Sequence, residues 1–274
     1  LILVAEQGIG DVILFMRYAG ELARRVPRLS IAVSRNLVAL VRSTGLFSEV
    51  YSEETLLDQG GKRVRSFPLL SVPGLLGVSR ERPLHTAPYV PTDSEMDRRW
   101  RERLRSEPGF LVGLNWQGNP EAEQGSNRGR SFPLEILHPL AEIPGVRFVS
   151  LQKGFGAEQL AGASFRDRFV PCQGDVDETW GFVETASMMA ACDLVITSDT
   201  APVHLAGAIG AQAWLLLSRS ADWRWGPDGD RAAWYPSVRL FRQARLGEWE
   251  SVILEVRDAL AARVGSQPEG ALKS

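Results

Sequence analysis

Cysteine, histidine and lysine are all scarce in this chain of 274 residues. The two cysteines, Cys172 and Cys192, are too few for a disulfide framework and indicate a reducing compartment, so we expect a cytoplasmic protein. The three histidines are scattered and the cysteines lack ligand spacing, so we expect no metal site. No apolar run reaches the roughly 18 to 20 residues of a membrane span, and no signal peptide is visible. The 33 acidic and 31 basic residues nearly balance, which gives no general attraction to nucleic acid.

What the chain does contain is apolar residues in short, regularly spaced runs. They make up 44% of the sequence, enough for one large domain or two modest ones. The runs alternate with helical patterns almost throughout, which predicts an α/β fold of parallel sheets with crossover helices. Leu1 to Val4 already has the pattern of a strand and no initiator Met precedes it, so we expect further chain upstream.

The predicted domains follow this alternation. We expect a Rossmann-like domain at 1–94, a charged linker helix at 95–108 with Asp93 or Ser94 as its cap, and a second Rossmann-like domain at 109–246. A helix at 247–263 and a flexible tail at 264–274 follow. In the first domain the expected strands are 1–5 and 29–34 and the expected helices 11–26 and 37–44, while 51–95 is expected to hold loops with short strands and turns. In the second, strands are expected at 110–116, 146–152, 168–172, 193–197 and 211–217, and helices at 133–143, 157–161, 181–191 and 202–209.

The loop from Glu6 to Asp11 is the first candidate site, because ligands of open α/β sheets bind at the carboxyl ends of the strands. Its glycines suit a tight turn. A dinucleotide fingerprint is disfavoured, since Ile13 replaces the third glycine and no acid ends the second strand. Asp11 either caps the following helix or presents a carboxylate to the cleft, where it can accept a proton.

A second loop, Ser198 to His204, opens the helix expected at 202–209. Thr200 is a suitable N-cap, and Pro202 fits the first turn. One interpretation is an ordinary capped helix, with His204 as a structural histidine. The other is a phosphate site, because free amides and the helix dipole attract anions.

Three further loops carry candidates. The long polar loop 117–130 holds Arg128 and Arg130, which either fork onto a diphosphate or are simply solvated. Lys153 lies at a strand end beside Gly154 and follows Gln152. In the third loop the tryptophans at 223, 225 and 234 either pack in the core or stack on a base or sugar ring in the cleft.

Two Asp-x-Asp strings, at 175–177 and 228–230, match the metal pair that some sugar transferases use. Both are expected in turn-like acidic stretches, where chance matches are common, so they do not change the expectation of no metal.

Seven strings occur in the order known from one family. They are AEQGIGD at 5–11, GLNWQGNP at 113–120, RSFPL at 130–134, SLQKG at 150–154, SDTAPVHLAG at 198–207, DWRW at 222–225 and WYP at 234–236. Together they resemble the glycosyltransferase-like domain at the C-terminus of bacterial tetratricopeptide-repeat proteins. That domain is similar to the ADP-heptose:lipopolysaccharide heptosyltransferases and, more distantly, to the O-linked N-acetylglucosamine transferases.

The resemblance implies a GT-B fold: two Rossmann-like, doubly wound parallel-sheet domains with the cleft between them, the first of them reduced. It implies that the second half binds the nucleotide-sugar, that the first binds the acceptor, and that the final helix crosses back toward the first half. It also implies upstream helical repeats that recruit a partner.

The residue roles that the resemblance implies are a general base, a donor site and a cleft lining. The base is Asp11. The donor and its phosphates are held by Arg130, Gln152, Lys153, Asp199, Thr200, Ala201 and His204, and the cleft is lined by Gly8, Gly10, Trp116, Asn119 and Trp223.

The expected activity is an inverting, metal-independent transfer of a hexosyl or heptosyl group to a hydroxyl of a protein, lipid or glycan. No cofactor is expected beyond the nucleotide-sugar substrate. The alternative is a catalytically inactive nucleotide- or nucleotide-sugar-binding scaffold beside the repeats. An epimerase ranks last, because it would need an acid/base cluster and the histidines at 85, 138 and 204 are dispersed.

Overall fold

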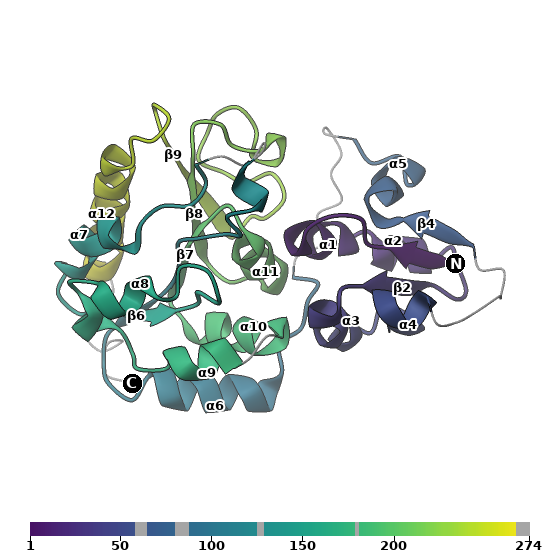
Figure 1. Ribbon diagram of the computed structural model, residues 1–274, viewed down its shortest axis with the longest axis horizontal. Coiled ribbons are helices and arrows are strands. Elements are labelled where there is room, and N and C mark those ends of the chain that lie inside the picture. The colour runs from purple at the N-terminus through teal and green to yellow at the C-terminus, as the bar shows by residue number, and fades with distance from the viewer. Residues whose placement is uncertain (58–64, 80–87, 125–128, 179–180, 267–274) are drawn as a thin grey trace.

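The computed structural model describes residues 1–57, 65–79, 88–124, 129–178 and 181–266, which form two α/β units (Figure 1). The first unit, residues 1–79, has four parallel strands in the order β3-β2-β1-β4. These strands are β1 Ile2–Val4, β2 Ser30–Val33, β3 Glu49–Ser52 and β4 Ser66–Pro68. Its helices are α1 Ile9–Met16, α2 Ala19–Ala23, α3 Val38–Ser43, α4 Glu53–Leu57 and α5 Val72–Leu75.

The second unit, residues 94–266, begins with α6 Ser94–Leu104 and has five parallel strands in the order β6-β5-β7-β8-β9. The strands are β5 Phe110–Asn115, β6 Val146–Ser150, β7 Leu194–Ser198, β8 Ala213–Leu217 and β9 Val238–Arg242. The helices are α7 His138–Ala141, α8 Gln159–Gly162, α9 Gln173–Glu178, α10 Phe182–Ala191, α11 Ala201–Ile209 and α12 Glu250–Gly265. The predicted α/β fold with two parallel sheets is thus confirmed. Within the described residues, no helix combines the length and apolarity that crossing a membrane requires.

The fifth strand of the second sheet is not where the sequence predicted it. The segment 168–172 follows a 3₁₀ turn at Arg166–Arg168 and makes a single bridge, from Phe169 to Phe148. Pro171 lacks the N–H that a ladder needs. The fifth strand is β9, whose Val238 and Leu240 are buried while Arg239 between them is exposed. Phe241 is buried as well, so β9 has side chains packed on both of its faces.

The helix predicted at 11–26 is two helices, and the first starts before Asp11. Gly8 occupies the N-cap position of α1, and Arg17 ends that helix. Asp11 is therefore a first-turn residue, and the interpretation as an N-cap is wrong. Asp93 does cap α6, since its carboxylate accepts a hydrogen bond of 2.8 Å from the backbone N–H of Met96. The string at 175–177 lies in α9 and not in a turn.

The final helix does not cross back to the first unit. Its buried side chains, Val252, Ile253, Val256 and Leu260, belong to a hydrophobic cluster of the second unit. Figure 1 accordingly places α12 beside α7 and β9, on the side of the second unit away from α1. The tail predicted as flexible lies, from residue 267 on, outside the described residues.

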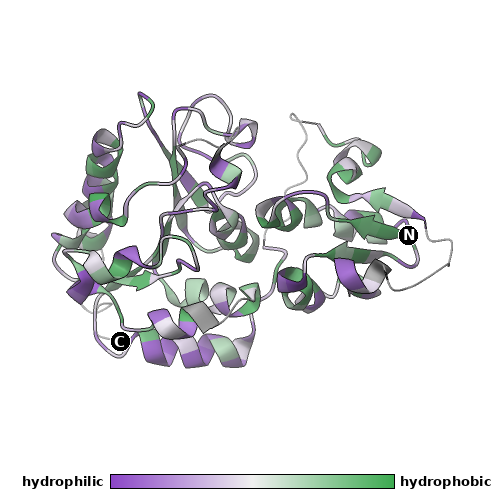
Figure 2. Ribbon diagram, in the orientation of Figure 1, coloured by the Kyte–Doolittle hydropathy of each residue, from purple (hydrophilic) through white to green (hydrophobic). Residues whose placement is uncertain are grey.

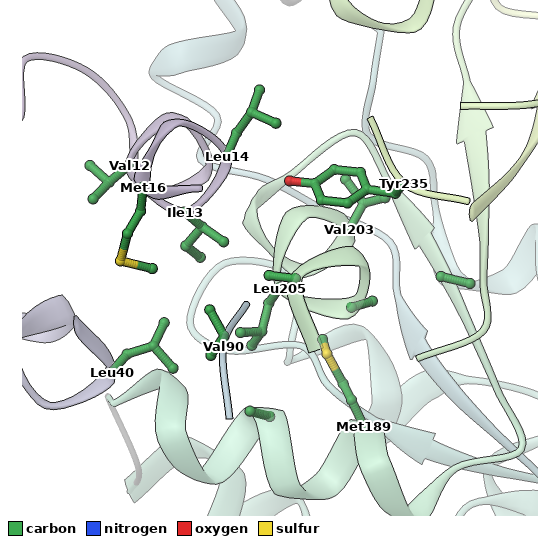
Figure 3. Packing of buried hydrophobic residues seen from close by; sticks show 14 of the residues in the cluster. Val12, Ile13, Leu14, Met16, Leu40, Val90, Met189, Val203, Leu205 and Tyr235 are labelled. Carbon is green, nitrogen blue, oxygen red and sulfur yellow. The ribbon is translucent and has the colours of Figure 1, made fainter. Parts of the chain in front are cut away.

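The two units share one hydrophobic core across their boundary. A single buried cluster includes Ile13 and Met16 of α1 together with Val203 and Leu205 of α11. In Figure 3 Ile13 lies between the two helices, with Leu205 and Val90 nearby, whereas Met16 points toward Leu40 and Val203 lies beside Tyr235. In Figure 2 the strands are mainly hydrophobic, whereas α6 is mainly hydrophilic. The seam between α1 and α11 fixes the start of each helix relative to the other.

A cleft between the two units

A cavity of about 660 Å³ lies where loops of both units meet. This volume is within the usual range of pockets for small ligands. Its walls are the loops that follow strands of both sheets, because parallel strands bring their carboxyl ends to one edge. The loops and their lining residues are 7–11 after β1, 117–119 after β5, 151–153 after β6, 199–202 after β7, and Asp222 with Arg224 after β8.

Most of the predicted site residues line this cavity. They are Gly8, Gly10, Asp11, Asn119, Arg130, Gln152, Lys153, Asp199, Thr200, Ala201 and His204. Gln7 and Asn36 complete the part that the first unit contributes, together with Ile9. Arg128 lies outside the described residues. The loops at the carboxyl ends of the strands thus bring these residues to one cavity, while their roles remain a prediction.

Two tryptophans predicted to line the cleft do not do so. Trp116 is fully buried in the core of the second unit, and its Nε1 donates a hydrogen bond of 3.1 Å to Gly156 O. Trp223 has 67% of its surface exposed. It lies in a 3₁₀ turn, Trp223–Trp225, whose neighbours Asp222 and Arg224 line the cavity. Its ring packs against the Arg224 guanidinium, 5.3 Å from the centroid, and meets the edge of Trp234.

Asp11 faces the cavity and forms an ion pair with Arg224. Burial raises the pKa of the Asp11 carboxyl, the Arg224 guanidinium lowers it, and Asp222 raises it further. The carboxylate is therefore a stronger base than an exposed aspartate. That property suits a group that must accept a proton near neutral pH.

The start of α11 opens onto the same cavity. Thr200 occupies the N-cap position, but its hydroxyl donates a hydrogen bond of 2.8 Å to Asn115 Oδ1 and does not cap the helix. The first turn of α11 thus presents its backbone dipole to the cavity without competition from that side chain. Such a helix start attracts anions, phosphate groups above all.

Gln152 organises the loops around this helix start. Its Oε1 accepts hydrogen bonds from Asn115 Nδ2 and from the backbone N–H groups of Trp116 and Gln117, at 2.9 to 3.1 Å. Its Nε2 donates to the carbonyl oxygens of Gln117 and Phe155. The Gln152 amide is only 2% exposed and already bonded at both ends, so it fixes loop geometry more directly than it offers bonds to a ligand.

Two of the predicted phosphate-binding cations are bonded within the protein. Arg130 Nε donates to Glu123 Oε1 at 3.2 Å, and its Nη1 donates to Asp199 O at 3.3 Å. Lys153 Nζ donates to Gly181 O at 3.1 Å. An incoming anion would compete with Glu123 for Arg130, so the affinity of this site depends on an acid that no motif in the sequence singles out.

Burial shifts the pKa of Asp199 and the pKa of His204 in opposite directions. Burial raises the pKa of the Asp199 carboxyl to about 6. Burial also lowers the pKa of His204 to about 3, so its ring is neutral at ordinary pH. The ring stacks on Trp225, and its Nδ1 lies 3.1 Å from the Tyr235 hydroxyl. His204 is thus a neutral side chain that lines the cavity, and Trp225 and Tyr235 hold its ring in place.

Arg224 and Asp222 are the functional candidates that sequence reasoning missed. Both belong to the DWRW string, in which Trp223 was the residue predicted to line the cleft. The usable signal was their position after β8, at the same edge of the sheet as the other loops. Among the described residues, no group of three or more His, Cys, Asp or Glu side chains is placed to hold a metal ion.

No family model matches the chain. Among curated proteins it is similar to Protein FlbA of Caulobacter vibrioides, at 29% identity over 286 aligned positions that include 95% of this chain. The match takes in 46% of FlbA, so the chain spans less than half of that relative.

The similar solved structures are sugar-transferring enzymes. A glycosyl transferase of family 9 from Veillonella parvula superposes with a TM-score of 0.66 at 13% identity, over 96% of this chain and 97% of that one. The ADP-heptose lps heptosyltransferase II of E. coli gives 0.63 at 14% identity, over 97% and 99%. E. coli heptosyltransferase WaaC with ADP gives 0.56 at 11% identity, over 95% and 99%. The chain therefore has the two-sheet fold of these glycosyltransferases.

Proposed function

We propose that this chain is a glycosyltransferase that moves a sugar from a nucleotide-sugar to an acceptor hydroxyl, with Asp11 as its general base. One observation carries the proposal: the Asp11 carboxylate of the first unit and the start of α11 in the second unit line one cavity. The two helix starts are in direct contact, since a Cβ on Gly10 would lie 3.6 Å from Ala201 Cα. A base and a phosphate site are therefore neighbours, as a sugar transfer requires.

The proposed reaction is a single displacement with inversion and needs no metal. The acceptor oxygen attacks the anomeric carbon, and Asp11 takes the proton of that hydroxyl. The bond from the anomeric carbon to the diphosphate breaks, and its electron pair goes to the leaving oxygen. The dipole of α11, Arg130 and Lys153 stabilise the negative charge that gathers there. The fold shared with heptosyltransferases, one of them solved with ADP, supports a nucleotide diphosphate as the leaving group.

The decisive experiment compares wild type with Asp11→Asn against a panel of nucleotide-sugars. The amide keeps the size of the side chain but cannot take the proton, so turnover should fall by about 10² to 10⁴. Affinity for a nucleoside diphosphate, measured by calorimetry, should change little. Asp258→Asn, at an exposed carboxylate of α12, is the matched control and should turn over normally. Equal turnover of wild type and Asp11→Asn would reject Asp11 as the base.

The second candidate is a nucleotide-binding scaffold without catalysis. The observation that favours it is the ion pair with Arg224, which occupies the carboxylate of Asp11. This candidate predicts that a nucleotide-sugar stabilises the protein against heat, while no member of the panel is transferred or hydrolysed. Turnover that depends on Asp11 excludes it.

A further inference from the structure

The proposed base, Asp11, needs a neighbouring group that keeps its carboxylate ionised and holds it in one orientation. We propose that Arg224 is the positioning residue for Asp11, and that it acts across the boundary between the two units. This inference rests on the proposed function of Asp11. It concerns a residue of the loop after β8, outside both the first unit and the start of α11.

Arg224 is held firmly on the second unit. Its backbone N–H donates to Asp222 Oδ1 at 3.0 Å, and its carbonyl oxygen accepts from Trp234 Nε1 at 2.8 Å. Its Nη1 also lies 2.8 Å from Asp222 Oδ1. With the backbone and one arm of the guanidinium fixed, the other arm, Nη2, meets Asp11 Oδ1. The planar fork of arginine makes such a placement directional.

The pair is sheltered from solvent, so its electrostatic effect is large. The side chains of Arg224 and Asp11 are 14% and 18% exposed. A charge pair at this depth is screened far less than one on the surface. The guanidinium therefore stabilises the ionised form of Asp11, which is the form that accepts a proton.

Among the charged side chains that shift the pKa of Asp11, only Arg224 lowers it. Burial and Asp222 raise this pKa, while the Arg224 guanidinium and the backbone hydrogen bonds at Gly8 and Asp11 lower it. The cations Arg130 and Lys153 line the same cavity, and each is bonded elsewhere in the second unit. Asp199, across the cavity, adds negative charge above its pKa of about 6. His204 contributes none, because its pKa of about 3 keeps it neutral. Removing Arg224 thus removes the largest of the effects that lower the pKa of Asp11, and burial and Asp222 remain.

Arg224 engages only one of the two carboxylate oxygens. Its Nη2 bonds Asp11 Oδ1, whereas Oδ2 lies beside Gly8, at 3.5 Å from the point where a Cβ would stand. The carboxylate also accepts hydrogen bonds from the backbone N–H groups of Gly8 and Asp11, which help Arg224 to hold it in place. Since Arg224 bonds Oδ1 alone, it can remain bonded while the proton is transferred.

The test uses two substitutions that are expected to shift the pKa of Asp11 in opposite directions. Arg224→Gln should raise the pKa of Asp11, because the opposite charge that lowers it is removed. Asp222→Asn should lower it. The readouts are the acid limb of the pH profile of kcat/KM and the titration of the Asp11 carboxyl carbon by ¹³C NMR. Arg224→Lys should retain most of the wild-type profile, and Arg219→Gln, at an exposed residue of the same loop, is the control.

Opposite shifts in the two variants support the positioning role, because general loosening of the loop would move both in one direction. An Asp11 titration that is unchanged in Arg224→Gln, or shifts of the same sign in both variants, would overturn it. The NMR titration needs no substrate. A chain that transfers no sugar but shows opposite shifts would therefore refute the proposed function while upholding the link between Arg224 and Asp11.

Discussion

Asp199 is the residue at which burial decides the charge of the cavity. Burial raises the pKa of its carboxyl to about 6, against the opposing effects of the Trp225 side chain and of Arg130 and Arg224. Below that pH the group is neutral, and above it a carboxylate stands at the start of α11. A dianionic ligand would be repelled by that carboxylate, so the proposed donor site is better suited to anions when Asp199 is protonated.

Asp199→Asn should stabilise the protein at pH 8 and leave its stability nearly unchanged at pH 4. The folded-state pKa lies above the ordinary value of 3.8, so the folded state binds the proton more tightly than the unfolded state. Stability therefore falls as pH rises from about 4 to about 6, and the full penalty persists above. A shift of this size corresponds to at most about 3 kcal/mol. Thermal melts at both pH values measure it, and an equal effect at both would contradict this origin.

At the residue scale, the sequence predicted which side chains reach the cavity better than it predicted which side chains they bond to. Asp11, Asp199 and Arg130 were correctly expected at one edge, because strand ends alone determine that edge. The ion pair of Asp11 with Arg224 joins segments far apart in the chain, whereas that of Arg130 with Glu123 lies within one loop. Neither pair follows a sequence pattern that would have revealed it. Trp116 was misplaced for a related reason: an aromatic residue at a strand end fits a core and a cleft equally well until the packing is known.

At the scale of elements, α1 approaches α11 closely at Gly10, since a Cβ there would lie 2.7 Å from His204 Cδ2. Gly10 was predicted to serve a turn. It lies instead inside α1, where it lets the helix approach the His204 ring. Gly207 of α11 makes a different close contact, because a Cβ there would lie 2.2 Å from Tyr235 Cδ1. Periodicity predicted both helices, but which of their faces meet depends on tertiary packing.

Gly10→Ala should destabilise the chain by roughly 1 to 3 kcal/mol, the usual effect of overpacking. The new methyl group must push α1 away from His204, which also moves Asp11 relative to the start of α11. Gly20→Ala, inside α2, is the matched control. Its Cβ would meet no atom nearer than 3.6 Å, and alanine is the better helix former there, so that variant should be slightly more stable than wild type. Denaturant titrations compare the two, and equal free energies of unfolding would contradict the tight contact.

At the scale of the whole molecule, the two units are joined by the contact between α1 and α11. The final helix does not join them. Arg17 at the end of α1 is only 4% exposed, and its Nη1 donates to Trp234 O at 2.8 Å. Its guanidinium lies over the ring of Tyr235, 4.6 Å from the centroid. The segment between the units adds to the seam, because the backbone N–H groups of Tyr89 and Val90 donate to Ala208 O. The expectation of a crossover helix came from the resemblance, whereas the shared core depends on tertiary packing.

A shared core makes both units unfold together. All eight tryptophans lie at or after Trp100, so their fluorescence reports the second unit, including Trp234 at its contact with Arg17, whereas far-ultraviolet circular dichroism reports both units. The two signals should give one coincident transition. Ile13→Ala, at a fully buried residue of α1, should lower both midpoints together by a free energy of about 2 to 5 kcal/mol. Leu75→Ala, at an exposed residue, should change neither. A fluorescence midpoint that stays at the wild-type value in Ile13→Ala would mean that the units fold separately and that the cleft is not fixed by its seam.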